Sequence, residues 1–295
     1  MTQLRALIYR NTKLYFKDKG MFFTSLITPM VLMLLYVTFL ANVYRDSFAS
    51  AAPEGISGNY IDALVAGEVV SSLLAVSCVT VSFCCNLLMV QDKACGNRAD
   101  LTIAPVKNKT LALGYYIATL VSSSVICLIA TALGFGYIAT MGWYLSMADV
   151  LLILADVFLL VMFGTALSSV IGFFLSTLGQ LSAVGTVVSS AYGFLCGAYM
   201  PISQFSEGLQ KVIKLLPGTY GTVLTRYHCT RGVFEKMQEA GMPQQYVQNL
   251  MRSIDCRIEI GQTAVSAPVM YLILGTTVCV LIGAYIFMNQ RKAKE

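Results

Sequence analysis

Charged residues are scarce in this chain, and their scarcity excludes several classes of protein. Of the 295 residues only 12% are charged and 57% are hydrophobic, and the mean hydropathy is +0.70, far outside the range of water-soluble domains. No Gly-x-x-x-x-Gly-Lys-Ser/Thr segment is present to hold phosphates, so the chain is not expected to hydrolyse ATP by itself. The single histidine, His228, falls outside every long apolar run, which argues against a serine–histidine hydrolase within the membrane.

Long apolar runs are what the chain has instead. A helix of about 20 apolar residues crosses the roughly 30 Å hydrocarbon layer of a bilayer at 1.5 Å per residue. Runs of this length predict an all-α, polytopic membrane protein whose residues 21–295 form one transmembrane domain with six spans. The predicted spans cover residues 21–41, 61–90, 111–140, 150–175, 183–200 and 267–288.

Basic residues beside the predicted spans indicate their orientation. Five Lys or Arg precede the first span, four lie in residues 91–110 and three follow residue 288, whereas residues 141–149 have none. The positive-inside rule then predicts a multi-pass protein of the cell membrane with both termini in the cytoplasm. This topology accounts for the formal net charge of +5. We therefore expect the chain to contact membrane lipid, and we expect no nucleic-acid partner. No cleavable signal peptide is expected, because residues 1–20 are polar and basic.

Residues 1–20 nevertheless have apolar side chains at helical spacing, interrupted by Arg10, Lys13 and Lys17. This pattern predicts an amphipathic helix on the cytoplasmic surface of the membrane. The alternative is a basic flank that only sets the orientation of the first span.

Residues 202–266 form the largest predicted external region, and we expect a small cap of short helices there. The first of these helices should end at Pro217-Gly218, a strong helix-breaking pair. Cys229 and Cys256 are the only cysteines of this region, so they are candidates for a disulfide, with two free thiols as the alternative. His228 beside Cys229 is expected to be a surface residue, and no metal site is predicted.

Two carboxylates lie within predicted spans, where ionisable groups are costly and suggest function. Glu68 lies about two turns into the second span, and Asp156 lies about two turns into the fourth, on the same helix face as Asp149. One hypothesis is a shared acidic site for a cationic drug or peptide. The alternative for each residue is a buried carboxyl that is hydrogen-bonded within the protein.

Small residues recur every four positions in the fifth predicted span, at Gly185, Ser189, Gly193 and Gly197. Four small side chains on one helix face allow a second helix to approach closely in lipid. The partner helix can belong to the same subunit or to another one.

Two segments carry a resemblance to a known family. The first follows the second span and reads Gln91-Asp92-Lys93-Ala94-Cys95-Gly96-Asn97-Arg98, then Leu101 and Ala104-Pro105-Val106. The second follows the fifth span and reads Gly197-Ala198-Tyr199-Met200-Pro201-Ile202, then Leu215-Leu216-Pro217-Gly218-Thr219-Tyr220 and Arg226. In order and spacing they resemble the cytoplasmic loop and the outer corner of type-2 ABC exporter permeases.

The resemblance implies half of a transport machine. It implies a separate cytoplasmic ABC ATPase subunit that binds ATP and Mg²⁺, two copies of which act on two permease subunits, forming a homo- or heterodimer; this chain itself binds no cofactor and has no catalytic residue. It also implies that residues 91–110 are the coupling loop, that the N-terminal helix lies beside it, and that the fifth span lines the pathway. The coupling candidates are Asp92, Lys93, Gly96, Arg98, Leu101 and Pro105, supported by Arg10, Lys13 and Lys17.

Other classes of function are alternatives to the exporter. A solvated basic loop that only sets topology is the alternative for the coupling candidates. An ATP-independent channel or secondary transporter would predict inverted repeats or broken helices with charged sites. A membrane-embedded enzyme acting on lipid would need clustered catalytic residues at one membrane face. The exported substrate implied by the resemblance is a drug, peptide, lipid or saccharide.

Overall fold

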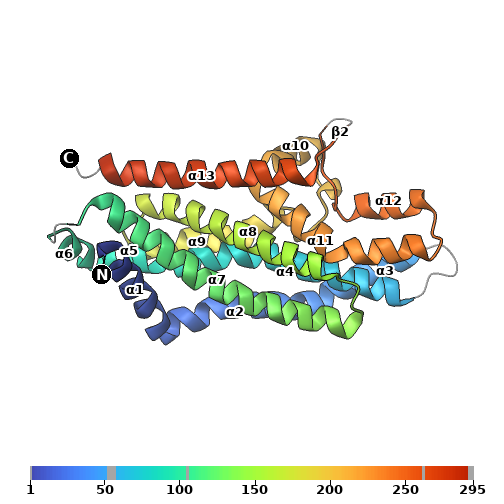
Figure 1. The fold of residues 1–295 in the computed structure, drawn as a ribbon, viewed down its shortest axis with the longest axis horizontal. Coiled ribbons are helices and arrows are strands. Elements are labelled where there is room, and N and C mark those ends of the chain that lie inside the picture. Colours follow the sequence, from blue (N-terminus) through green and yellow to red (C-terminus); the bar gives the residue numbers. More distant parts are fainter. Residues whose placement is uncertain (1, 52–57, 104–105, 261–262, 292–295) are drawn as a thin grey trace.

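The computed structural model describes residues 2–51, 58–103, 106–260 and 263–291, and nearly all of these residues are helical. The elements are α1 (Gln3–Lys17), α2 (Lys19–Leu35), a π-helical turn (Tyr36–Leu40), α3 (Ala41–Ala51), α4 (Gly58–Cys85), α5 (Leu87–Ala94), α6 (Asn97–Ile103), α7 (Asn108–Met141), α8 (Met147–Phe174), α9 (Leu178–Leu195), a 3-10 turn (Ile202–Gln204), α10 (Glu207–Leu215), α11 (Pro217–Glu239), α12 (Gln244–Ser253), β1 (Glu259–Ile260), β2 (Thr263–Ala264) and α13 (Ala267–Arg291). The long helices run along one axis (Figure 1). The start of α1, all of α6 and the end of α13 lie at one end of the bundle, and α3 and α12 lie at the other.

The central helix of the bundle is α4. Almost every residue from Ala63 to Cys85 is buried, because α2, α7, α8, α9 and α11 pack around this helix. Glycine allows the closest of these approaches: a Cβ atom on Gly164 of α8 would lie 2.9 Å from the Cα atom of Val79. By contrast, α2 buries few side chains and exposes large apolar ones such as Phe23 and Leu34, as expected of a helix that faces lipid.

Polar residues at the helix ends explain several boundaries. Ser146 and Asp149 form a capping box at the start of α8, and Thr177 and Gln180 form another at the start of α9. Gly142, with a φ of 139°, ends α7, since a residue with a Cβ atom rarely adopts this conformation.

In the described ranges, five helical stretches are long and apolar enough to cross a membrane: Lys19–Asp46, Gly58–Ala94, Asn108–Met141, Met147–Phe174 and Ala267–Arg291. They coincide with five of the six predicted spans, so the prediction of an all-α polytopic membrane protein is confirmed. The other predicted span, residues 183–200, corresponds to α9, which has 18 residues and is not among the five. The count of six spans therefore stays a prediction.

The region from residue 202 to residue 266 differs from the expected cap of short helices. α10 and α12 are short, but α11 has 23 residues and packs against α4, α8 and α13. Its first half is inside the bundle, because a Cβ atom on Gly221 would overlap Leu160 of α8 and crowd Leu274 of α13. Hydropathy did not predict this burial, because α11 is polar. Pro217 was expected to end the preceding helix, and it also begins α11.

Candidate functional site

The predicted coupling loop and the N-terminal helix meet at one carboxylate. Asp92, at the end of α5, is 2% exposed, and its Oδ2 atom lies 2.8 Å from Nη1 of Arg10 on α1. Oδ2 also accepts a hydrogen bond from the Tyr115 hydroxyl of α7 at 2.7 Å, and Oδ1 accepts one from Nδ2 of Asn97 on α6 at 3.1 Å. The hydrogen bond to Asp92 raises the pKa of Arg10, which stays charged. We call Arg10, Asp92, Asn97 and Tyr115 the α1–α5 junction.

Two neighbouring basic residues extend the junction to other helices. Nζ of Lys93 donates to the carbonyl oxygens of Gly172 and Phe173, at 2.8 and 2.9 Å, where α8 ends. A cation at this position is favourable because the last carbonyl groups of a helix lack partners within it. Nη2 of Arg98 donates to Oδ1 of Asn289 near the end of α13 at 2.8 Å. The coupling candidates therefore connect α5 and α6 with α1, α7, α8 and α13.

The remaining coupling candidates are spread over the same end of the bundle. Gly96 is exposed and has a φ of 82°, which suits the tight connection between α5 and α6. Leu101 is half-buried beside the core residues of α7 and α8, and Lys13 and Lys17 are exposed on α1. Pro105 lies outside the described residues. The loop pattern in the sequence predicted where the coupling candidates lie, but it did not predict which side chains they contact.

One exposed apolar residue at this end of the bundle was not among the predicted site residues. Ile103, the last residue of α6, is 83% exposed. The sequence does contain a hint of this residue. Ile103 is an apolar residue in an otherwise mostly polar stretch of the loop that, by the resemblance, contacts the ATPase.

The two predicted intramembrane carboxylates each pair with α11. Oε2 of Glu68 lies 2.8 Å from Nε of Arg226, and both side chains are 1% exposed. Nη2 of Arg226 also donates to Oγ of Ser72 at 3.1 Å and to the carbonyl oxygen of Gly197 at 2.9 Å. One buried arginine thus joins α11 to α4 and to the turn after α9.

Asp156 pairs with the lone histidine. Its Oδ2 atom lies 2.6 Å from Nδ1 of His228, and its Oδ1 atom accepts a short hydrogen bond from the Tyr271 hydroxyl of α13. His228 is 3% exposed, so the expectation of a surface histidine is wrong; the burial of α11 places it among the spans. Oδ1 of Asp149 lies 2.7 Å from Nη2 of Arg231.

Three carboxylates of α4 and α8 are therefore matched one to one by three basic residues of α11, which we call the α11 ion pairs. The hypothesis of a shared acidic site fails in this structure, because Glu68, Asp149 and Asp156 have separate partners and are all buried. The alternative of buried, paired carboxyls describes them. A sequence signal was present: buried charges need partners, and the segment that forms α11 carries several basic residues that could pair with the unexplained acids of the spans.

The cysteine candidates are not joined. Cys229 and Cys256 are both free and buried, and Sγ of Cys256 lies 3.3 Å from the Thr230 hydroxyl. Within the described part of the chain, no three His, Cys, Asp or Glu side chains are grouped to hold a metal ion.

The small residues of α9 serve different purposes. A Cβ atom on Gly193 would overlap the ring of Tyr199, whose hydroxyl donates to the carbonyl oxygen of Ser189. Gly197 has a φ of 71° in the turn that follows α9. Gly185 has open space where a Cβ atom would lie, so nothing in this chain requires a glycine there. Two of the four positions are thus explained by the turn that follows the helix.

This arrangement of apolar helices, tied together by buried ion pairs, defines a polytopic membrane protein. The family model of the ABC-2 type transporter matches residues 2–228. The chain therefore belongs to the ABC-2 type transporter family, as the resemblance predicted. A search of curated proteins found no match.

Membership of the family identifies the chain as an ABC transporter permease subunit. Such a permease is a membrane transport component without a nucleotide site of its own, and it partners with an ABC ATPase subunit. The matched residues include the whole α1–α5 junction and the first half of α11, with Arg226 and His228.

Proposed function

We propose that this chain is the permease subunit of an ABC exporter, which assembles with a second, identical or homologous permease subunit and two ATPase subunits. The complex moves a drug, peptide, lipid or saccharide outward through an alternating-access pathway in the cell membrane. The observation that carries the proposal is the α1–α5 junction. It joins the two segments expected to contact the ATPase through a single buried carboxylate.

The junction provides a route for force. Ile103 gives α6 an exposed apolar contact for a groove on the ATPase, at the end of the bundle where α1 begins (Figure 1). A displacement of α6 would reach α1 through Asp92 and α13 through Arg98, while Lys93 holds the adjoining α5 to the end of α8. Closure of the ATPase pair would thus move several helix ends together, as rigid-body switching requires.

The α11 ion pairs support the other half of this mechanism. They tie α11 to α4 and α8 by buried contacts, so that the region after α9 follows the spans as they rock. A rocking bundle whose far end moves as one unit suits alternating access.

Assembly with the ATPase is the main test. Ile103→Asp should reduce by at least tenfold the amount of ATPase that copurifies with the chain, because an exposed apolar contact is replaced by a charge. Met147→Asp is the matched control: Met147 is 76% exposed at the start of α8, at the opposite end of that helix from the junction. Failure of the unmodified chain to bind its co-encoded ATPase would overturn the proposal, and equal recovery with Ile103→Asp would remove α6 from it.

Orientation has a separate test in a native thiol. Cys95 is exposed between α5 and α6, so a membrane-impermeant maleimide should label it only after cells are permeabilised. A cysteine introduced by Glu239→Cys at the far end of α11 should be labelled in intact cells. The reverse pattern would place the termini outside and contradict an ATPase contact at α6.

The dimer is tested at Gly185. Gly185→Leu meets no atom of its own chain within 4 Å of the new Cβ atom, so the stability of the monomer should change little. If α9 faces the second permease subunit, the bulky side chain should shift the purified complex from dimer to monomer in native mass spectrometry. An unchanged dimer would place the interface on another helix.

A further inference from the structure

A cavity of about 290 Å³ lies between α11, the start of α13 and the β1–β2 hairpin. Its volume is about that of ten water molecules in the liquid. It opens at the end of α13 where that span begins, which is the level of a membrane–water interface. None of the residues of the α1–α5 junction or of the α11 ion pairs lines it.

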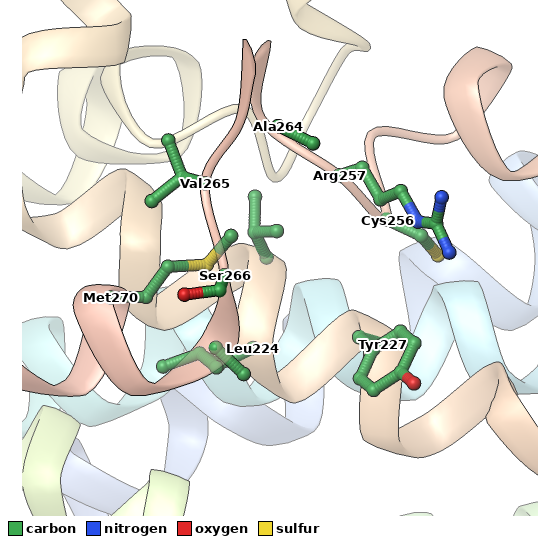
Figure 2. A pocket seen from close by; sticks show the side chains of 10 residues that line it. Leu224, Tyr227, Cys256, Arg257, Ala264, Val265, Ser266 and Met270 are labelled. Atoms are coloured by element: carbon green, nitrogen blue, oxygen red, sulfur yellow. The ribbon is translucent and has the colours of Figure 1, made fainter. Parts of the chain in front are cut away.

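One part of the cavity is apolar. Val223 and Leu224 of α11 lie opposite Val265 and Met270, and Figure 2 shows Leu224, Val265 and Met270 gathered on one side. Val223, Leu224 and Met270 belong to a buried cluster with Tyr220 and Ile258. An aliphatic chain is the ligand group that such a surface accepts, because it replaces water there without leaving a polar atom unpaired.

The other part is polar and positively charged. Arg257 and Tyr227 lie together across the cavity from Met270 (Figure 2), and Ser266 lies between the hairpin and α13. Among the described residues, the guanidinium of Arg257 and the hydroxyls of Tyr227 and Ser266 have no hydrogen-bond or ion-pair partner. The described residues of the lining include one cation and no carboxylate, and the positive end of the α13 dipole adds to the field in the cavity.

We propose that this cavity binds a single-chain anionic amphiphile, with its aliphatic chain against Leu224 and Met270 and its carboxylate or phosphate head on Arg257. A guanidinium matches both head groups because it donates two parallel hydrogen bonds to them. A cationic amphiphile is disfavoured, since it would face Arg257 with no acid to compensate. The binding step is independent of the proposed exporter function.

Photolabelling of the purified full chain in phosphatidylcholine nanodiscs tests the site. A diazirine-bearing palmitate should crosslink to peptides from α11 and the start of α13. Excess dodecanoate or dodecyl phosphate should compete, whereas dodecyltrimethylammonium should not. Crosslinks elsewhere, or equal competition by the cation, would overturn the proposal.

Two variants and a control sharpen the test. Arg257→Gln should lower the labelling at least fivefold, and Arg257→Lys should restore part of it. Arg252→Gln is the control, because Arg252 is also an exposed arginine of this region, is paired with Glu259 and does not line the cavity. Equal labelling of Arg257→Gln and the unmodified chain, with both eluting as folded protein, would refute the assignment of the head group.

The ligand can come from the bilayer or from the transported molecules, and a further arm separates these sources. Lysophosphatidylglycerol, an anionic membrane lipid with a single chain, should displace the probe from the nanodisc if the site holds membrane lipid. Release of the probe during ATP turnover by the assembled complex would identify a transported molecule; this arm alone rests on the proposed function.

Discussion

The Glu68–Arg226 pair allows the most direct test of the buried contacts. We consider Arg226→Met, Glu68→Leu and the double variant, because methionine and leucine keep much of the side-chain volume without the charge. Each single change leaves one ion of a pair that is 1% exposed on both sides. The double change removes both ions.

The expected magnitudes follow from the contacts. Breaking a buried pair by removing one partner costs about 3–5 kcal/mol, because an uncompensated charge stays buried. The double variant loses no charge balance within the pair but leaves Ser72 and the carbonyl oxygen of Gly197 without their donor, a cost of about 1–2 kcal/mol. At about 2 °C per kcal/mol for a chain of this size, Tm should fall by about 6–10 °C for each single variant and by about 2–4 °C for the double.

The assay is thermal unfolding of the purified chain, followed by the fluorescence of Trp143, its single tryptophan. This residue is 49% exposed and packs on Phe135, so its emission should change when the bundle opens. Arg252→Met is the control, since its partly exposed pair with Glu259 should contribute about 1 kcal/mol or less. Two results would refute the reasoning. One is a double variant whose Tm is no higher than that of the less stable single variant, and the other is a fall of Tm for Arg226→Met no larger than that of the control.

Three further predictions concern the junction, the helix packing and pH. Asp92→Ala should release α1 and speed tryptic cleavage within it several-fold, whereas Tyr9→Ala, at an exposed position of the same helix that is not a tryptic site, should not. Gly67→Ala should lower Tm by about 2–6 °C, because its Cβ atom would lie 2.8 Å from a backbone carbonyl oxygen of α11 and overpacking costs about 1–3 kcal/mol; Gly136→Ala, with no atom within 4 Å, should not lower it. Burial raises the pKa of Asp255 above 3.8, so its contribution to stability is full below that pH and is lost as pH rises through the folded-state pKa. Asparagine tolerates the φ of 52° at this position, so Asp255→Asn should keep the fold and should flatten the fall of Tm between pH 4 and pH 7. An unchanged slope would mean that other titratable groups cause the fall.

Much of the candidate site was predictable as a location but not as a set of contacts. The loop after the second span and the N-terminal helix were both expected, and the structure has α5, α6 and α1 there. Asp92 and Lys93 were predicted to take part in coupling to the ATPase, and in the structure their side chains bind other helices of the same chain. The apolar pattern of a loop does not reveal which of its polar groups turn inward.

The sequence by itself determined the class of protein and the positions of five spans, because an apolar run long enough to cross a bilayer is a local property of the chain. Only the tertiary structure decided the fate of the charges within and beyond those spans. Glu68 and Arg226 are separated by more than 150 positions, and their pairing depends on α11 entering the bundle beside α4. α11 is too polar to be recognised as a buried helix by hydropathy, and its basic side chains are accommodated in the bundle because carboxylates of the surrounding helices pair with them.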